Sequence, residues 1–233
     1  MKIHVGTSGY GYKEWKGKFY PPQIRAAEML RFYAERLAAV EINNTFYRMP
    51  TENLLRSWAD QVPGDFLFAF KAPRTITHLK RLKDVDEETG YLFRTLAILG
   101  GRLGPVLFQF PKGFRPEPAQ MEYFLGLIPG GAACAFEFRG AARPAGAVLE
   151  LLAARGYSLC AADTDEQPAG DLPGGASWGY LRLRRSEYRE ADLLRWRENI
   201  RAQNWERAFV FFKHEEEARG PEAAIRFREL SLP

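Results

Sequence analysis

Apolar and polar residues alternate along residues 39–43, where Val40 and Ile42 flank Glu41. This period of two is typical of a half-buried strand, with one face toward a core and the other carrying the Glu41 carboxylate and the Asn43 amide. A buried glutamate is costly unless it is paired, hydrogen-bonded or hydrated. A glutamate at an interior position of a strand therefore indicates that the Glu41 carboxylate has a specific structural or functional role.

Strand patterns and helical patterns alternate along the whole chain. The predicted strands are residues 2–6, 39–43, 66–71, 106–110, 133–138, 157–162, 178–183 and 208–212. The predicted helices are residues 26–38, 51–62, 86–99, 116–128, 145–154, 189–203 and a last helix that starts at 221. Residues 163–177 are rich in Gly, Pro and Asp and lack a helical period, so the helix of the sixth crossover should be shortened or absent.

Eight strands that alternate with about seven helices predict a parallel sheet covered by helices. No Gly-x-Gly-x-x-Gly motif opens a helix, which favours a closed (β/α)8 TIM-barrel-like fold over an open doubly wound sheet. No linker rich in Ser, Pro and Gly divides the chain, so we expect residues 1–233 to form a single domain.

In such a barrel, alternate residues of each strand point inward, and functional groups gather where the strands end. Side-chain parity places polar groups inside on five strands. They are Glu41, Asn43, Lys71, Gln109, Glu137, Arg139, Tyr180 and Arg182, with Arg184 if its strand continues. We predict one polar cluster at the mouth, with Lys71 and Arg139 beside the two glutamates. Its candidate catalytic groups are Glu41, Glu137 and Lys71, and its candidate substrate-binding groups are Asn43, Gln109, Arg139 and Arg182.

Two loops supply further candidate substrate-binding residues. The loop after the first strand carries Tyr10, Tyr12 and Trp15, and we expect it to fold over the mouth with at least one ring lining the pocket. The alternative is that these rings only cover the core. His78 lies in a polar loop after the third strand, where the alternative to substrate binding is an ordinary exposed histidine.

Charge and hydropathy restrict the partners. The net charge of +4 suggests an anionic partner, but the basic residues are interleaved with acidic ones, which is only a weak sign of nucleic-acid binding. We predict a small anionic ligand, with nucleic acid as the alternative. We expect no membrane partner, because no apolar run approaches the length of a membrane span. The strand pattern begins at residue 2 without a charged and then apolar leader, so we expect a cytoplasmic location.

Metal and cysteine chemistry have little support. The chain has three histidines, so a site for several metal ions is not expected. Glu41, Glu137 and Asp163 could hold a single Mg²⁺ or Mn²⁺, against competition from nearby cations. We assign no metal ligands and keep a single divalent cation as an alternative. Cys134 and Cys160 lie in predicted buried strands and should be free thiols.

Short motifs along nearly the whole chain carry a family resemblance. They are Gly6-Thr7-Ser8-Gly9-Tyr10, Trp15-Lys16-Gly17-Lys18-Phe19-Tyr20-Pro21, Val40-Glu41-Ile42-Asn43-Asn44-Thr45-Phe46-Tyr47, Phe70-Lys71 with Thr77-His78, Gln109-Phe110-Pro111 and Glu137-Phe138-Arg139. Together they resemble the YecE-like family, catalogued as domain of unknown function 72. The resemblance implies a TIM-barrel-like fold but no reaction. In this family the eighth strand commonly ends in an Asn-rich motif, but here it ends in Lys213-His214-Glu215. We therefore assign no role at these positions to asparagine side chains.

Three functional hypotheses follow from the sequence. The first is an enzyme of the hydrolase or lyase type, in which Lys71, Arg139 and Arg182 hold a small anionic or phosphorylated substrate and a glutamate acts as acid or base. The second is a nucleic-acid-binding or nucleic-acid-processing barrel that stacks bases on the aromatic loop. The third is a glycosidase, which needs two carboxylates about 5 or about 7 to 9 Å apart and free of arginine. A structural ion-pair network and a non-catalytic ligand-binding barrel are the alternatives to all three.

Overall fold

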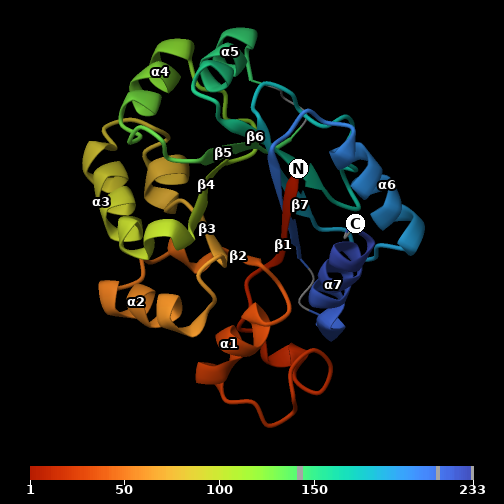
Figure 1. The fold of residues 1–233 in the computed structure, drawn as a ribbon. Helices are drawn as coiled ribbons and strands as arrows, with labels where there is room; N and C mark the ends of the chain where they lie inside the picture. Colours follow the sequence, from red (N-terminus) through yellow and green to blue (C-terminus); the bar gives the residue numbers. More distant parts are fainter. Residues whose placement is uncertain (141–143, 214–215, 232–233) are drawn as a thin grey trace.

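The computed structural model describes residues 1–140, 144–213 and 216–231, and its strands close into a barrel (Figure 1). The strands are β1 Lys2–Ser8, β2 Ala39–Ile42, β3 Leu67–Lys71, β4 Leu103–Phe110, β5 Cys134–Phe138, β6 Ser158–Asp163, β7 Trp178–Leu183 and β8 Arg207–Phe212. Each strand pairs in parallel with its neighbours in sequence, and β8 pairs with β1. The predicted (β/α)8 fold is confirmed.

Seven α-helices of the described chain lie around the strands (Figure 1). They are α1 Met29–Ala34, α2 Glu52–Gln61, α3 Asp86–Leu96, α4 Pro118–Gly126, α5 Gly146–Ala154, α6 Glu190–Arg201 and α7 Arg219–Ser231. The Thr51 hydroxyl caps α2 by accepting from the Leu54 amide at 3.3 Å, as expected at a helix start. Residues 163–177 contain no helix, as predicted. Within the described ranges, no helix is both long enough and apolar enough to cross a bilayer.

Some predicted boundaries were wrong where local geometry interrupts a helical pattern. The helix predicted at residues 26–38 is a 3₁₀ turn followed by the short α1, and the helix predicted at 86–99 changes from α3 to 3₁₀ geometry after Leu96. Gly100, whose φ of 54° is costly for other residues, lies in that 3₁₀ segment. The β4 strand begins at Leu103, three residues earlier than predicted, because its first residues already pair with β3.

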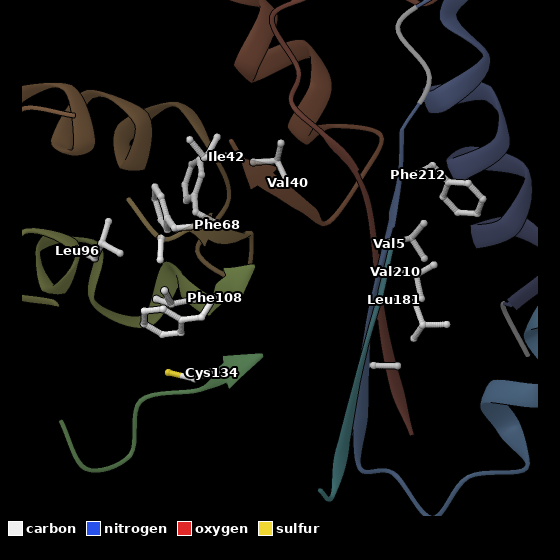
Figure 2. Close-up of a cluster of buried hydrophobic side chains, with 14 of the residues drawn as sticks. Val5, Val40, Ile42, Phe68, Leu96, Phe108, Cys134, Leu181, Val210 and Phe212 are labelled. Atoms are coloured by element: carbon white, nitrogen blue, oxygen red, sulfur yellow. The ribbon is translucent and has the colours of Figure 1, made fainter. Parts of the chain in front are cut away.

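Outward-facing side chains form the main hydrophobic core between the barrel and the helices. On β2 this face carries Val40 and Ile42, as the alternation predicted. Figure 2 shows Leu96 of α3 facing the strands and Phe212 of β8 pointing toward the helices at the blue end of the chain. Because these residues occupy the outward face, the residues between them, such as Glu41, point into the barrel.

Small and large side chains complement each other inside the barrel. The small ones are Ala39, Ala69 and Ala135 on β2, β3 and β5, with Leu107 on the β4 strand between them, and the large ones are Trp178, Tyr180, Phe209 and Phe211 on β7 and β8. Rings from one wall therefore fill the space that the alanines of the other wall leave, as close packing requires. This layer forms an apolar floor beneath the polar mouth.

A close approach between β1 and β2 requires a glycine at position 6. A Cβ added to Gly6 would lie 1.9 Å from the carbonyl oxygen of Ala39, which is backbone and cannot rotate away. Gly6→Ala should therefore lower the free energy of unfolding by about 2 kcal/mol or more, measured by urea denaturation. Gly11→Ala is the matched control, because no atom lies within 4 Å of its new Cβ. Equal stability of the two variants would contradict this account.

Candidate functional site

A buried arginine joins the two predicted glutamates across the barrel. Arg182 of β7 donates from Nη2 to Glu41 Oε1 at 2.8 Å and from Nη1 to Glu137 Oε2 at 2.7 Å. All three side chains are buried, with exposed fractions of 3% for Arg182, 0% for Glu41 and 3% for Glu137. The two carboxylates are therefore bridged by one guanidinium whose planar donors face both of them.

Neutral donors complete the environment of Glu41. Its Oε1 accepts from Ser8 Oγ at 2.7 Å and Asn43 Nδ2 at 2.9 Å, and its Oε2 accepts from Tyr180 Oη at 2.7 Å. Burial alone would raise the pKa of Glu41. The charge of Arg182 and these hydrogen bonds outweigh burial and hold the pKa below its usual value. Glu41 is thus an ionised, fully coordinated carboxylate near neutral pH.

Glu137 is held in the same way, by two arginines. Arg184 donates from Nη2 to Glu137 Oε1 at 2.9 Å, on the side away from Arg182. Burial opposes ionisation, but the two guanidinium groups and hydrogen bonds from Arg182 and Gln109 lower the pKa to about 2. Cys160 Sγ lies 4.0 Å from Glu137 Oε2, and burial followed by the Glu137 charge raises the pKa of this thiol. Neither glutamate is available as a proton acceptor while these contacts persist.

We expected Lys71 and Arg139 beside the two glutamates, but among the described residues the ion pairs of Glu41 and Glu137 are made by other arginines. Arg182 extends across the barrel from β7 and forms ion pairs with both carboxylates. Arg184 forms a second ion pair with Glu137. Ser8, Cys160, Tyr180 and Arg184 belong to the cluster but were not among the predicted site residues. Parity had pointed Tyr180 and Arg184 inward, whereas nothing in the sequence distinguished Ser8 from an ordinary strand end.

Lys71 ends β3 beside this neutralised cluster. Its half-buried side chain places Nζ 3.9 Å from the centroid of the Phe46 ring, a cation–π contact. In the described part of the chain it has no ion-pair partner. Burial and then the charge of Arg182 lower the pKa of Lys71 to about 8, against the opposing effect of the two glutamates. Lys71 is the group at the mouth that can change its protonation state near neutral pH.

His78 and Arg139 lie on the same side of the mouth as Lys71. His78 belongs to the π-helical turn Thr75–Leu79, its ring meets Phe46 edge-on at 4.9 Å, and Nδ1 lies 2.9 Å from Thr77 Oγ1. Burial lowers the pKa of His78, and the charges of Lys71 and Arg139 lower it further. Arg139 is exposed just beyond β5. Two cations therefore act on a histidine that is neutral at pH 7.

The aromatic residues of the first loop pack together and against helices. Tyr10 contacts Tyr33 of α1 and Trp58 of α2, with ring centroids 6.2 and 6.4 Å apart. Trp15 is 1% exposed, and Tyr12 packs on it at 4.8 Å while donating to the Ser8 carbonyl. These contacts favour the alternative in which the loop covers the core, because the three rings pack on one another or on neighbouring aromatic side chains. They do not support the stacking lid.

Asp163 belongs to a different network from the two glutamates. It accepts from the Ala169 amide at 2.8 Å, from Tyr188 Oη at 2.9 Å and from Arg185 Nη2 at 3.1 Å. Glu41, Glu137 and Asp163 do not gather around a common point, and no metal-binding group of three or more His, Cys, Asp or Glu occurs among the described residues. His214 and Glu215 of the strand-eight departure lie outside the described residues. The bridging Arg182 also removes the arginine-free carboxylate pair that a glycosidase needs.

These features define a (β/α)8 barrel whose carboxyl-terminal mouth holds a buried Glu–Arg–Glu bridge beside Lys71, a lysine with no ion pair in the part of the chain that the structure describes. The chain belongs to the family described as "Protein of unknown function DUF72", whose model matches residues 4–232. The YecE resemblance is confirmed as well. The UPF0759 protein YecE of Escherichia coli K12 is 31% identical over 130 residues, which are 55% of this chain and 45% of that protein. The match thus spans less than half of that relative.

Solved structures of the family have the same fold. A DUF72 family protein from Thermotoga maritima is 25% identical, with a TM-score of 0.84 over 99% of both chains. Another from Enterococcus faecalis V583 is 17% identical, with a TM-score of 0.81 over 98% of this chain and 95% of that one, and it supports the fold alone.

Proposed function

We propose that this protein is an enzyme of the hydrolase or lyase type that acts on a small anionic substrate at the carboxyl-terminal mouth of the barrel. The observation that carries the proposal is a surplus of positive charge. Arg182 and Arg184 match the charges of Glu41 and Glu137. Lys71 and Arg139 remain without a carboxylate partner among the described residues. An anionic group of a substrate is the natural counter-charge.

The site residues then have distinct roles. Lys71 and Arg139 hold the anionic group, and Lys71 can also give or take a proton because its pKa of about 8 is close to neutral pH. Glu41 and Glu137 stay ionised and keep Arg182 in position, so their role is positioning rather than acid–base chemistry. His78, neutral beside the two cations, can donate or accept one hydrogen bond to the substrate.

Sulfate binding tests the charge of the site, because the charge of sulfate does not change between pH 6 and 10. Affinity should be nearly constant below the Lys71 pKa of about 8. Above it, affinity should fall by up to about tenfold per pH unit as Lys71 loses its proton. The measurement is isothermal titration calorimetry at several pH values. Lys71→Met should weaken sulfate binding and remove its pH dependence. The same variant should lose any hydrolysis of anionic esters that a substrate screen finds for the wild type.

Lys83→Met is the control, because Lys83 is exposed on the segment that follows the His78 turn. It should retain the wild-type pH profile. Absence of sulfate binding in the wild type would overturn the anion site. If an oligonucleotide bound instead, with affinity falling steeply as salt rises, the nucleic-acid hypothesis would replace this one.

A further inference from the structure

The shortest strand pairing in the closed barrel is the one between β5 and β6. These strands pair at Ala135 with Ser158 and at Phe136 with Leu159, at the lower end of the sheet. By contrast, β4 stays paired with β5 as far as Phe138. No β5–β6 residue pair follows Phe136. The pairing therefore ends just before Glu137, the next residue of β5.

The crossover without a helix lines a cavity beside this short pairing. Residues 163–177 leave β6 and turn back at once, held by the hydrogen bond from the Ala169 amide to Asp163 and by the one from the Gln167 amide to Thr164 Oγ1 at 3.0 Å. Between this segment, the two strands and α5 lies a cavity of about 830 Å³. A helix in the usual position would occupy this space.

The cavity is lined by both apolar and charged side chains. The apolar ones include Phe138, Leu149, Leu159, Ala161 and Leu172. Two arginines, Arg139 and Arg184, line it together with Glu137. Arg184 uses Nη2 for Glu137, and its buried Nε–H has no hydrogen-bond partner among the described residues. Three acidic residues of the crossover segment also line the cavity, namely Asp165, Glu166 and Asp171. They would repel an anion from the crossover segment and favour its placement at the two arginines.

We propose that this side cavity binds an apolar group of the substrate while the anionic group of the same molecule lies at Arg139, toward Lys71. The substrate class is an amphipathic organic anion, rather than an inorganic anion or a sugar phosphate. Arg139 connects the two parts of the site, because it lines the cavity and its charge acts on His78 beside Lys71. The inference rests on the proposed function, since it takes the mouth as the anion site.

A series of alkyl sulfates tests the proposal, because its members share one head group and differ only in chain length. Affinities of methyl, propyl, butyl and hexyl sulfate are measured at pH 7 by calorimetry, below micelle-forming concentrations. Each added methylene should tighten binding by up to about fourfold until the cavity is full. Ala161→Phe should keep methyl sulfate affinity and abolish the gain with chain length, because the ring occupies the space beside the apolar side chains. Ala169→Phe, in the crossover segment, repeats the test if the strand variant does not fold.

Ala223→Phe is the matched control. Ala223 is half-buried like Ala169, but it lines a separate cavity of about 530 Å³ beside α7. This variant should show the wild-type chain-length dependence. If methyl sulfate binds in a Lys71-dependent way and longer chains bind no better, the side-cavity proposal is overturned while the anion site stands. If no member of the series binds, both fail. A chain-length gain that survives both cavity-filling variants also overturns the proposal.

Discussion

Replacing Arg182 with methionine should lower the free energy of unfolding by about 3 to 5 kcal/mol, measured by urea denaturation near pH 7. The reason is that Glu41 and Glu137 would keep their buried positions but lose the guanidinium that bridges them at 2.8 and 2.7 Å. Methionine keeps an unbranched apolar chain in place of the arginine stem and adds no new charge or hydrogen-bond donor.

The pH dependence of this effect has a definite sign. In the wild type, the pKa of Glu137 is lowered to about 2, so its stabilising contribution is present above its usual pKa and is lost as the pH falls toward 2. Without Arg182, burial raises the carboxyl pKa values, and protonation then relieves the buried charge. The difference between the variant and the wild type should therefore shrink as the pH is lowered.

Arg184→Met is the control for Arg182. Arg184 is 19% exposed, and its ion pair within the described chain is with Glu137, which would retain Arg182, so its removal should cost clearly less. An Arg182 variant with nearly wild-type stability would mean that the glutamates do not depend on the bridge.

Glu41→Gln should destabilise the protein by about 3 kcal/mol, again measured by urea denaturation. Glu41 accepts four hydrogen bonds, from Ser8, Asn43, Tyr180 and Arg182. Glutamine has a single acceptor oxygen, and its NH₂ group would face the hydroxyl donor that now bonds the other oxygen. Arg182 would also keep only one of its two carboxylates.

Glu28→Gln is a suitable control for Glu41→Gln. Glu28 also bonds an arginine, Arg25, at 2.6 Å, but this pair is on the surface and its removal should leave stability close to that of the wild type. A loss of less than about 1 kcal/mol for Glu41→Gln would instead return Glu41 to the candidate catalytic groups.

Side-chain parity carried most of what the sequence could predict. The period of two along β2 and β5 pointed Glu41 and Glu137 inward, and the same rule on β7 pointed Arg182 inward. Parity assigns a side chain to the interior but not to a partner, because inward side chains from opposite walls meet across the barrel. Arg182 could therefore not be distinguished from Lys71 as the partner of the glutamates.

Two other features depended on three-dimensional packing that leaves no periodic signal. The loop carrying Tyr10 and Trp15 has no strand or helix period, so the sequence did not show whether its rings turn to the mouth or to the helices. The short pairing of β5 with β6 depends on how far two strands stay within hydrogen-bonding distance. Its only sign in the sequence was the missing helical period of residues 163–177.

The apolar floor beneath the mouth limits how this barrel can change during evolution. Its wall of small residues, Ala39, Ala69 and Ala135, faces the rings of β7 and β8. A larger residue on one wall must be accompanied by a smaller residue on the facing wall. Tolerated substitutions at these positions should therefore occur in pairs, one in β2, β3 or β5 and the other in β7 or β8. Tyr180 belongs to this floor and also bonds Glu41, so a volume exchange at that position would disturb the charged layer above. Among related chains, position 180 should therefore vary less than positions 209 and 211.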